Sequence, residues 1–210
     1  MSPTKTIIIF GSGPGIGNHV ASYFLSQNFT HAILLSCSTS RLESDKAVLQ
    51  ANLPSIPPTL KKIEQLTDSI DVVFFNAVRI EPSPVLQVPI QEIEQDFKTT
   101  NLALYLISQW SIPLLQSTSS QPSNPKPSLL VTTSHLPHTP LPTLLSLSLV
   151  KASQRNMVTS LSTAFPSSSG IHIGLVAVEG VVTPENKVLN PSTIAQRVWG
   201  FYMAGGGVGG

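Results

Sequence analysis

A short apolar segment that ends in glycines constrains the fold of this chain more than any other feature. Residues 6–10, Thr-Ile-Ile-Ile-Phe, are a β-branched run typical of a strand buried on both faces. Gly11, Gly13, Gly15 and Gly17 follow at once, and such glycines let the backbone turn sharply and approach a phosphate. The sequence therefore predicts a strand, a turn and a helix over 16–27 whose free N–H groups face a pyrophosphate.

Strand and helix patterns alternate along the rest of the chain, which is typical of a parallel sheet covered by helices on both faces. The predicted fold class is α/β, a Rossmann-like doubly wound parallel sheet of about six strands. Five further strands are expected at 31–36, 46–50, 70–75, 129–134 and 170–178. Further helices are expected over 60–67, 90–115, 142–164 and 191–203.

The length bounds the domain organisation. A chain of 210 residues suits one α/β domain with a full core, so residues 1–203 are predicted to form a single domain. The Gly-rich residues 204–210 are predicted to be a disordered tail, and the Ser/Pro-rich residues 116–128 a mobile surface loop. About ten residues separate the second and third expected strands, which predicts a shortened crossover there.

The charge pattern excludes several classes of partner. Charged residues make up only 11% of the chain, the formal net charge is +1, and no basic run exists, so no nucleic-acid partner is expected. Without a signal peptide or a run of about 18 apolar residues, we expect no membrane span and a cytoplasmic location. The single cysteine, Cys37, fits a reducing compartment. A small molecule is the expected partner.

The glycine turn and several later motifs resemble the short-chain dehydrogenase/reductase family, from residue 5 to about residue 200. In the order of the chain, the matching positions are Asn76-Ala77 after the fourth expected strand, Asn101 in the long helix, Ser134 closing the fifth strand, Lys151, and Gly180 with Thr183. The resemblance implies that Asn101 steadies a proton-relay water, that Ser134 is the catalytic serine, and that Lys151 belongs to the family's Tyr-x-x-x-Lys pair. It also implies homo-oligomers that pair through the two long helices, and a seventh strand where this chain has its Gly-rich tail.

The position four residues before Lys151 departs from the family, because it is Leu147 and not tyrosine. In the family the lysine lowers the pKa of the tyrosine hydroxyl one helical turn away, and leucine has no proton to transfer. Losing a general acid removes a rate factor of about a hundred to ten thousand. The chain is therefore identified as an atypical member without the tyrosine.

The resemblance also implies a set of cofactor-binding residues. They are Gly11, Ser12, Gly15, Ile16, Gly17, Ser36, Arg41, Asn52, Asn76, Ala77, Lys151, Gly180 and Thr183. No acid follows the second strand, where NAD-dependent members bind the ribose, whereas Arg41 suits the extra phosphate of NADP. NADP is thus the expected cofactor. Asn52 replaces an Asp that touches adenine, and Glu179 replaces the Pro before Gly180. The glycines can also be explained without a bound ligand, because the strand-to-helix turn itself can require them.

Six residues are candidates for the chemistry: Ser134, Lys151, Asn101, His135, Glu179 and Arg79. Histidine side chains exchange protons in the neutral pH range, so His135 could replace the missing acid, and Arg79 could contact an anionic or carbonyl oxygen of a substrate. Each of the six can also be explained without a catalytic role, as a surface, capping or snorkelling residue. His135 and His138 have no third ligand at a suitable spacing, so no metal site is expected.

Three functions remain open. The first is non-redox acid–base chemistry, of the cyclase, isomerase or lyase type, on a small organic substrate such as a secondary metabolite. The second is an NADP-dependent carbonyl reductase in which His135 or water donates the proton. The third is a catalytically silent subunit that keeps the fold for binding.

Overall fold

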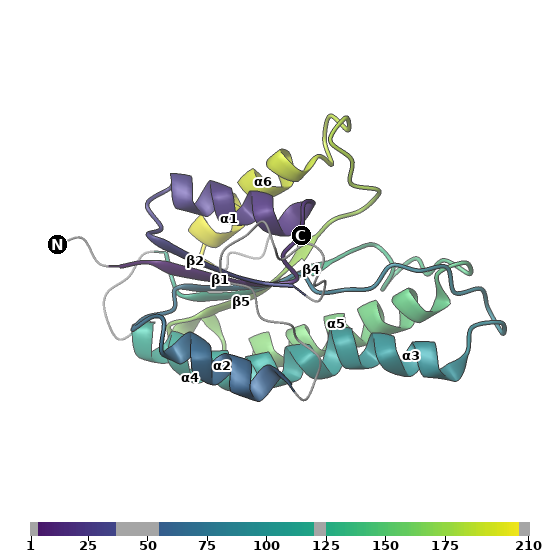
Figure 1. Ribbon diagram of the computed structural model, residues 1–210, viewed down its shortest axis with the longest axis horizontal. Helices are drawn as coiled ribbons and strands as arrows, with labels where there is room; N and C mark the ends of the chain where they lie inside the picture. Colours follow the sequence, from purple (N-terminus) through teal and green to yellow (C-terminus); the bar gives the residue numbers. More distant parts are fainter. Residues whose placement is uncertain (1–3, 37–54, 120–124, 206–210) are drawn as a thin grey trace.

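The computed structural model describes residues 4–36, 55–119 and 125–205. A single twisted sheet lies between two layers of helices (Figure 1). One layer consists of α1 (Ile16–Ser26) and α6 (Pro191–Met203), which pack against each other. The other contains α2 (Ile56–Glu64), α4 (Ala103–Ser119) and α5 (Leu145–Ala164). The predicted doubly wound α/β fold is confirmed.

The described sheet has five parallel strands in the order β2-β1-β3-β4-β5. They are β1 (Thr6–Phe10), β2 (His31–Leu35), β3 (Val72–Phe75), β4 (Ser128–Thr133) and β5 (His172–Ala177). Each overlaps a strand that the sequence predicts. The expected strand at 46–50 and the shortened crossover before it lie outside the described residues. The chain turns to opposite sides after β1 and β3, and ligands of such sheets bind at the carboxyl ends beside this reversal.

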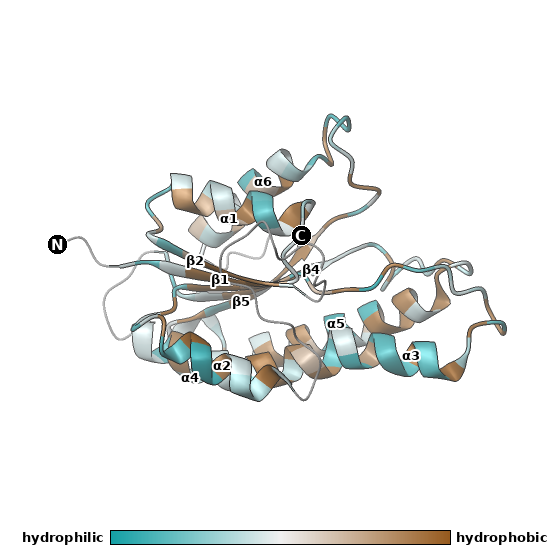
Figure 2. Cartoon of the chain, in the orientation of Figure 1, coloured by the Kyte–Doolittle hydropathy of each residue, from teal (hydrophilic) through white to brown (hydrophobic). Residues whose placement is uncertain are grey.

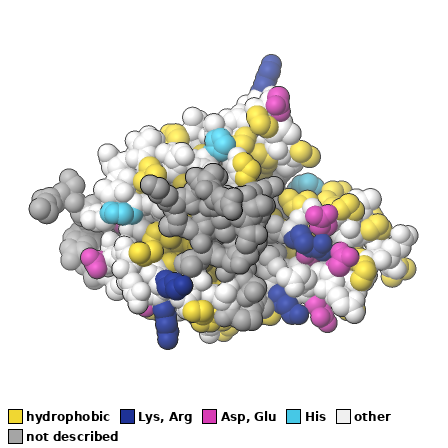
Figure 3. All heavy atoms as spheres, viewed as in Figure 1, with side chains coloured by type: hydrophobic (Ala, Val, Ile, Leu, Met, Phe, Trp, Pro, Cys, Tyr) yellow, Lys and Arg dark blue, Asp and Glu magenta, His cyan; other side chains and the backbone are white. Residues whose placement is uncertain are grey.

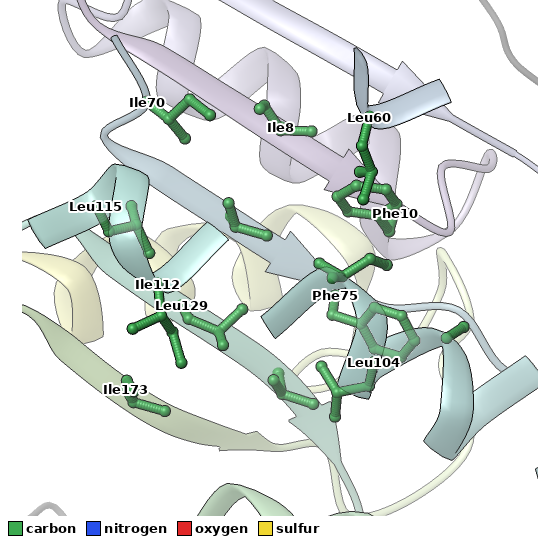
Figure 4. Packing of buried hydrophobic residues seen from close by; sticks show 14 of the residues in the cluster. Ile8, Phe10, Leu60, Ile70, Phe75, Leu104, Ile112, Leu115, Leu129 and Ile173 are labelled. Atoms are coloured by element: carbon green, nitrogen blue, oxygen red, sulfur yellow. The ribbon is translucent and has the colours of Figure 1, made fainter. Parts of the chain in front are cut away.

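The residues of β1 alternate between the two halves of the core. Ile7 and Ile9 pack toward α1 and α6, whereas Ile8 and Phe10 pack toward α2, α4 and α5. This is the pattern of a strand buried on both faces, and the hydropathy colouring of Figure 2 shows the sheet as its apolar centre. In Figure 4, the rings of Phe10 and Phe75 lie between Leu60 and Leu104.

The α1/α6 layer is held by aromatic side chains. Trp199 of α6 makes edge contacts with Phe24 of α1 and with Phe29, at centroid distances of 5.0 and 6.1 Å. Tyr202 packs against the same two rings. The other layer has the second tryptophan, Trp110 of α4, whose Nε1 donates a hydrogen bond of 2.7 Å to Glu64 of α2.

Three predicted helix boundaries are wrong. The helix predicted at 60–67 begins at Ile56, because Pro57 and Pro58 occupy its first turn, where a missing N–H costs nothing. The helix predicted from Pro142 begins at Leu145, after an irregular segment that contains Pro140 and a turn that contains Pro142. The loop predicted from residue 116 starts later, because α4 continues to Ser119. The last helix is confirmed, and the Asn190 side chain caps it by accepting 2.8 Å from Thr193 N.

The long helix predicted over 90–115 is interrupted. It consists of α3 (Ile90–Phe97), a π-helical segment η3 (Lys98–Leu102) and α4. A π turn inserts one extra residue, which rotates the apolar face between the two α-helices. Phe97, which the spacing places on the buried face, is therefore 40% exposed, and Asp96 is buried in its place.

A short 3-10 turn, η4 (Ser167–Ser169), precedes β5. None of the described helices has the length and apolarity needed to cross a membrane.

Candidate functional site

The carboxyl ends of the strands meet along one edge of the sheet. Phe10 lies in register with Leu35 on one side and with Phe75 on the other, and Phe75 pairs with Val131. The residues that follow these strands, among them Gly11, Ser36, Asn76 and Ser134, are thus brought to the same edge. Arg41 and Asn52, two of the predicted cofactor-binding residues, lie outside the described residues.

Two glycines of the first turn are required by packing within the protein. Gly11 has φ +90°, and a Cβ there would lie 2.5 Å from Asn76 C and closer still to Ala77 N. A Cβ on Gly17 would lie 2.9 Å from both Gly11 O and Ser12 Cα. For Gly11 and Gly17 the fold alone explains the glycine.

Gly13 and Gly15 are different, because a Cβ at either position would meet no heavy atom of the described residues within 4 Å. Neither residue has a positive φ. Within the described part of the chain their backbone is uncrowded directly before α1, whose first turn has no acidic residue and whose N-terminus has no side-chain cap. Free N–H groups beside an uncrowded glycine backbone fit the phosphates of a dinucleotide.

Polar side chains fix the shape of this turn. Ser12 Oγ donates 2.7 Å to Asn18 Oδ1, and Asn18 N donates 3.1 Å to Gly13 O. Ser12 N and Gly11 N both donate to Leu35 O of β2, at 2.8 and 2.9 Å. The turn is thereby formed by the protein itself, and Ile16 begins the helix directly behind it.

A chain of hydrogen bonds connects the glycine turn with α5. Asn76 Nδ2 donates 3.1 Å to Gly11 O, and Asn76 Oδ1 accepts 2.9 Å from Thr132 Oγ1. The carbonyl oxygen of Thr132 in turn accepts 2.9 Å from Lys151 Nζ. Asn76 and Lys151, both predicted from the resemblance, therefore belong to one connected group that spans β1, β3, β4 and α5.

Lys151 is buried, with an exposed fraction of 5%. Its ammonium makes a second hydrogen bond, of 2.9 Å, to Gln154 Oε1 on the next turn of α5. Burial disfavours the charged form and lowers the pKa of Lys151 to about 8. An amine with this pKa exchanges protons near neutral pH far more readily than a surface lysine.

Asn101 lies in the π-helical segment η3 and is fully buried. Its Nδ2 donates 3.2 Å to the carbonyl oxygen of Val150, one residue before Lys151. Its Oδ1 has no hydrogen-bond partner among the described residues. The predicted Asn101 and Lys151 are thus brought to the same contact between η3 and α5, and π turns are frequent at functional sites.

At the Tyr position of the family motif the structure has an apolar cluster. Leu147 is 6% exposed and packs with Leu136 and Val150, and with Val78 and Leu144 at the edge of the cluster. Ser134 Oγ accepts a hydrogen bond of 3.3 Å from Leu136 N, so it is engaged with its own loop. His135 follows in a turn, half-buried, and its carbonyl oxygen accepts from two backbone N–H groups.

The structure places Arg79 in a network within the protein. Its guanidinium donates 2.6 Å to Asp96 and 3.0 Å to Glu92, and these two hydrogen bonds, that to Asp96 first, raise its pKa. Asp96 is only 4% exposed and also accepts 2.6 Å from Ser146 Oγ of α5. The backbone N–H of Ser146 donates a hydrogen bond of 3.0 Å to Ser83 Oγ, which ties the loop after β3 to α5. Arg79 therefore joins α3, this loop and the start of α5.

The remaining candidates lie on the loop between β5 and α6. Glu179 and Gly180 are exposed, Gly180 has φ +152°, and Thr183 O accepts 3.2 Å from Asn186 N. Among the described residues no hydrogen bond joins this loop to Lys151 or Ser134. The structure thus does not bring Glu179, Gly180 and Thr183 into the Lys151 group.

Sequence reasoning missed Gln154 and Asp96. Gln154 stands among the buried residues of α5, so a polar residue on that face was the available signal, whereas Asp96 gave none because the helical spacing places Phe97 on the buried face of α3. Thr132 gave no signal, because its contacts to Asn76 and Lys151 join residues 56 and 19 positions away.

Charged side chains are scattered over the face seen in Figure 3 and form no basic patch there. Within the described residues, no group of three or more His, Cys, Asp or Glu side chains could hold a metal ion.

Comparison of the sequence with family models and with curated proteins finds no match. Solved structures do match in fold. ElxO with NADP bound aligns with a TM-score of 0.73 at 18% identity, over 86% of this chain and 75% of that one. The 3-ketoacyl-(acyl-carrier-protein) reductase from Brucella melitensis complexed with NADH gives 0.78 at 14%, over 93% and 89%. A short-chain dehydrogenase from Rhodopseudomonas palustris gives 0.74 at 14%, over 94% and 91%. The chain is therefore similar in fold to oxidoreductases of this kind.

Proposed function

We propose that this chain binds NADP(H) at the carboxyl edge of its sheet and acts as a short-chain-dehydrogenase-like oxidoreductase on a small carbonyl compound. The observation that carries the proposal is the open backbone at Gly13 and Gly15, beside the uncapped N-terminus of α1. Packing among the described residues does not require these two glycines, and neither has a left-handed φ, whereas a bound pyrophosphate would explain both. The nicotinamide, when bound, supplies the hydride.

The residues that would hold the dinucleotide extend along the edge from the turn to α5. Gly13, Gly15 and Ile16 offer backbone N–H groups to phosphate, and Lys151 offers its ammonium to the ribose. Lysine has three N–H donors, and two of them bind Thr132 O and Gln154 Oε1, which leaves one for a ligand. Arg41 remains the predicted contact for the extra phosphate of NADP.

The proton must come from a group other than Leu147. With a pKa of about 8, Lys151 is mainly an ammonium at neutral pH, and its neutral form is accessible within the same range. His135 is the second candidate, because it stands at the same strand end as Ser134. We infer that Lys151 holds the proton and that Ser134 orients the substrate oxygen.

The names of the structural neighbours support the redox function, since ElxO is described with NADP and the Brucella melitensis reductase with NADH. The second candidate is acid–base chemistry without net redox change, of the isomerase, cyclase or lyase type. It is favoured by the apolar packing of Leu147, which leaves Lys151 without its partner phenol. The two candidates differ in whether turnover consumes NADPH.

Titration with NADPH, followed by nucleotide fluorescence, tests the proposal directly. We expect binding by the natural chain and a loss of affinity of about tenfold or more in Gly15→Ala, because a methyl group occupies space that the phosphate needs. Gly200→Ala is the matched control, since a Cβ on Gly200 of α6 also meets no heavy atom within 4 Å. Absence of NADPH binding at millimolar concentration would overturn the proposal and leave non-redox acid–base chemistry and the silent binding subunit.

The single domain over 1–203, the homo-oligomer and the cytoplasmic location remain predictions. The segment η3 and the helices α4 and α5 expose Leu102, Tyr105 and Leu149, respectively, which fits pairing through the two long helices. Sedimentation of the purified chain would show whether copies associate.

A further inference from the structure

A buried glutamine stands directly beside the candidate lysine. Gln154 is fully buried on α5, in a series of buried residues that otherwise includes Leu147, Val150 and Val158. Its Oε1 accepts 2.9 Å from Lys151 Nζ. Because an ammonium can only donate, the oxygen and not the nitrogen of this amide must face Lys151. The orientation of the amide is therefore fixed by chemistry.

The other half of this amide is unsatisfied. Gln154 Nε2 has no hydrogen-bond partner among the described residues, and the same holds for Asn101 Oδ1 of η3. Burying an amide nitrogen without a partner costs stability, and an apolar side chain at this position of α5 would avoid the cost. The hydrogen bond that Gln154 accepts from Lys151 is the favourable contact that offsets this cost.

We propose that Gln154 is a positioning residue that keeps the Lys151 ammonium charged and held against the end of β4, in a site where the phenol partner has been replaced by Leu147. The amide oxygen stabilises the protonated form of Lys151 more than the neutral form, because a hydrogen bond from an ammonium is charge-assisted and one from a neutral amine is not. Thr132 O holds the same ammonium from the β4 side at 2.9 Å. Together the two oxygens fix its direction.

No carboxylate performs this task in the part of the chain that the structure describes. Four elements pack against α5, namely α3, η3, β4 and β5, and the titratable groups on them and on α5 are Glu92, Glu94, Asp96, Lys98, Arg155 and His172. Asp96 and Glu92 bind Arg79, and Lys98 lies 3.9 Å from Glu94 at the surface. His172 contacts Phe201 of α6 on the opposite face of the sheet, and Arg155 is exposed. Burial alone lowers the pKa of Lys151, with no charged neighbour opposing it.

The charge of Lys151 follows from geometry and stands without the cofactor. That the Lys151 ammonium binds a ribose or a substrate oxygen rests on the proposed function. In that use, Gln154 sets the pH range over which the lysine can bind as a cation or release a proton. Removal of the amide oxygen makes Lys151 neutral at a lower pH, whereas a carboxylate in its place keeps the lysine charged to a higher pH.

The test follows the Cε resonance of Lys151 by NMR in protein labelled with 13C-lysine, titrated without any nucleotide and assigned with Lys151→Arg. In Gln154→Met, which keeps the length of the side chain but not the oxygen, we expect the midpoint to fall by about one pH unit or more. In Gln154→Glu we expect it to rise. The other lysines serve as internal references.

Gln109→Met is the matched control, because Gln109 is an exposed glutamine on α4 whose amide contacts Tyr105 and not Lys151. An unchanged midpoint in Gln154→Met overturns the proposal, even where the variant is more stable than the natural chain. Where Gln154→Met does not fold, Gln154→Glu decides, and a midpoint that fails to rise overturns the proposal. Because no nucleotide is present, this outcome is independent of whether NADPH binds.

Discussion

The two ends of the candidate site are built from different parts of the chain. At the β1–α1 end the backbone forms the site, and packing against Asn76 and Ala77 demands a glycine at position 11. At the β4–α5 end side chains form the site, and Leu147 and Gln154 stand where they change the surroundings of Lys151. The path of this turn persists as long as the fold persists, because packing requires Gly11 and Gly17. A side-chain site can change one residue at a time.

This difference between the two ends explains why a substitution can affect cofactor binding and chemistry separately. Gly13 and Gly15 keep the open backbone that a phosphate needs. Lys151 keeps its position relative to β4, through Thr132. Position 147, one helical turn before Lys151, has a leucine where the motif that the sequence resembles has a tyrosine. We therefore expect the following substitutions to affect the two ends in different ways.

The largest expected effect is a gain of activity at the β4–α5 end. Leu147→Tyr places a phenol one turn before Lys151, and a general acid contributes a factor of about a hundred to ten thousand in rate. We expect NADPH oxidation with a panel of small carbonyl compounds to rise by about a hundredfold. Leu147→Phe is the control, because it adds the ring without the hydroxyl. Equal rates in the two variants would show that the missing phenol does not limit the chemistry.

At the β1–α1 end the largest effect is on stability. Gly11→Ala forces a side chain into the left-handed region and against the backbone of Asn76 and Ala77. Left-handed strain and overpacking together cost about 3 to 5 kcal/mol, so we expect a large fall in the urea midpoint. Gly13→Ala meets no atom and has no such strain, and it should keep the midpoint of the natural chain. Equal stability of the two variants would contradict the division between packed and open glycines.

Arg79 tests whether the network behind α5 is structural. Arg79→Ala leaves the buried carboxylate of Asp96 with only Ser146 as a side-chain partner, and we expect a loss of about 2 kcal/mol of unfolding free energy. Arg79→Lys keeps the charge but not the paired N–H donors, and it should lose less. A changed KM with unchanged stability would instead return Arg79 to the role of a substrate contact.

The smallest expected effect lies at the opposite edge of the sheet. Burial raises the pKa of Asp71, against the lowering effects of the Thr6 N–H group and of Lys5. A carboxyl group with a raised folded pKa favours the fold fully only below its unfolded pKa, and this contribution is lost as the pH rises through the folded pKa. Asp71→Asn should therefore stabilise the chain more at pH 7 than near pH 4, measured by urea unfolding at both. An equal difference at the two values would contradict the assigned shift.

Local signals predicted the parts of the fold that depend on neighbouring residues. The β-branched run of β1, the glycine turn and the Asn190 cap each act within a few positions of the chain. The start of α2 was missed because Pro57 and Pro58 suit a loop and a first helical turn equally well. The π segment η3 leaves no local mark, and it reverses which of Asp96 and Phe97 is buried.

The candidate site shows the same difference between features set by neighbouring residues and features set by distant contacts. Positions that resemble a motif were found where expected, as with Asn76, Asn101 and Lys151, because the strand ends and the helix phase fix them. The hydrogen-bond partners in the site were not predicted, because Arg79 binds Asp96, which is 17 residues away in the sequence, and Lys151 binds Thr132, which is 19 residues away. Contacts of this kind depend on how two elements approach each other, which no short stretch of sequence encodes.

The placement of the two tryptophans gives the molecule a pair of optical reporters, one in each layer of helices. Trp199 lies among the rings of the α1/α6 layer, whereas Trp110 lies on α4, hydrogen-bonded to Glu64. Replacing one tryptophan by phenylalanine leaves an emission signal that belongs to a single layer. Quenching during denaturation would then show whether the layer that supports Lys151 loosens before the layer that supports the glycine turn, and so whether the two ends of the candidate site melt together.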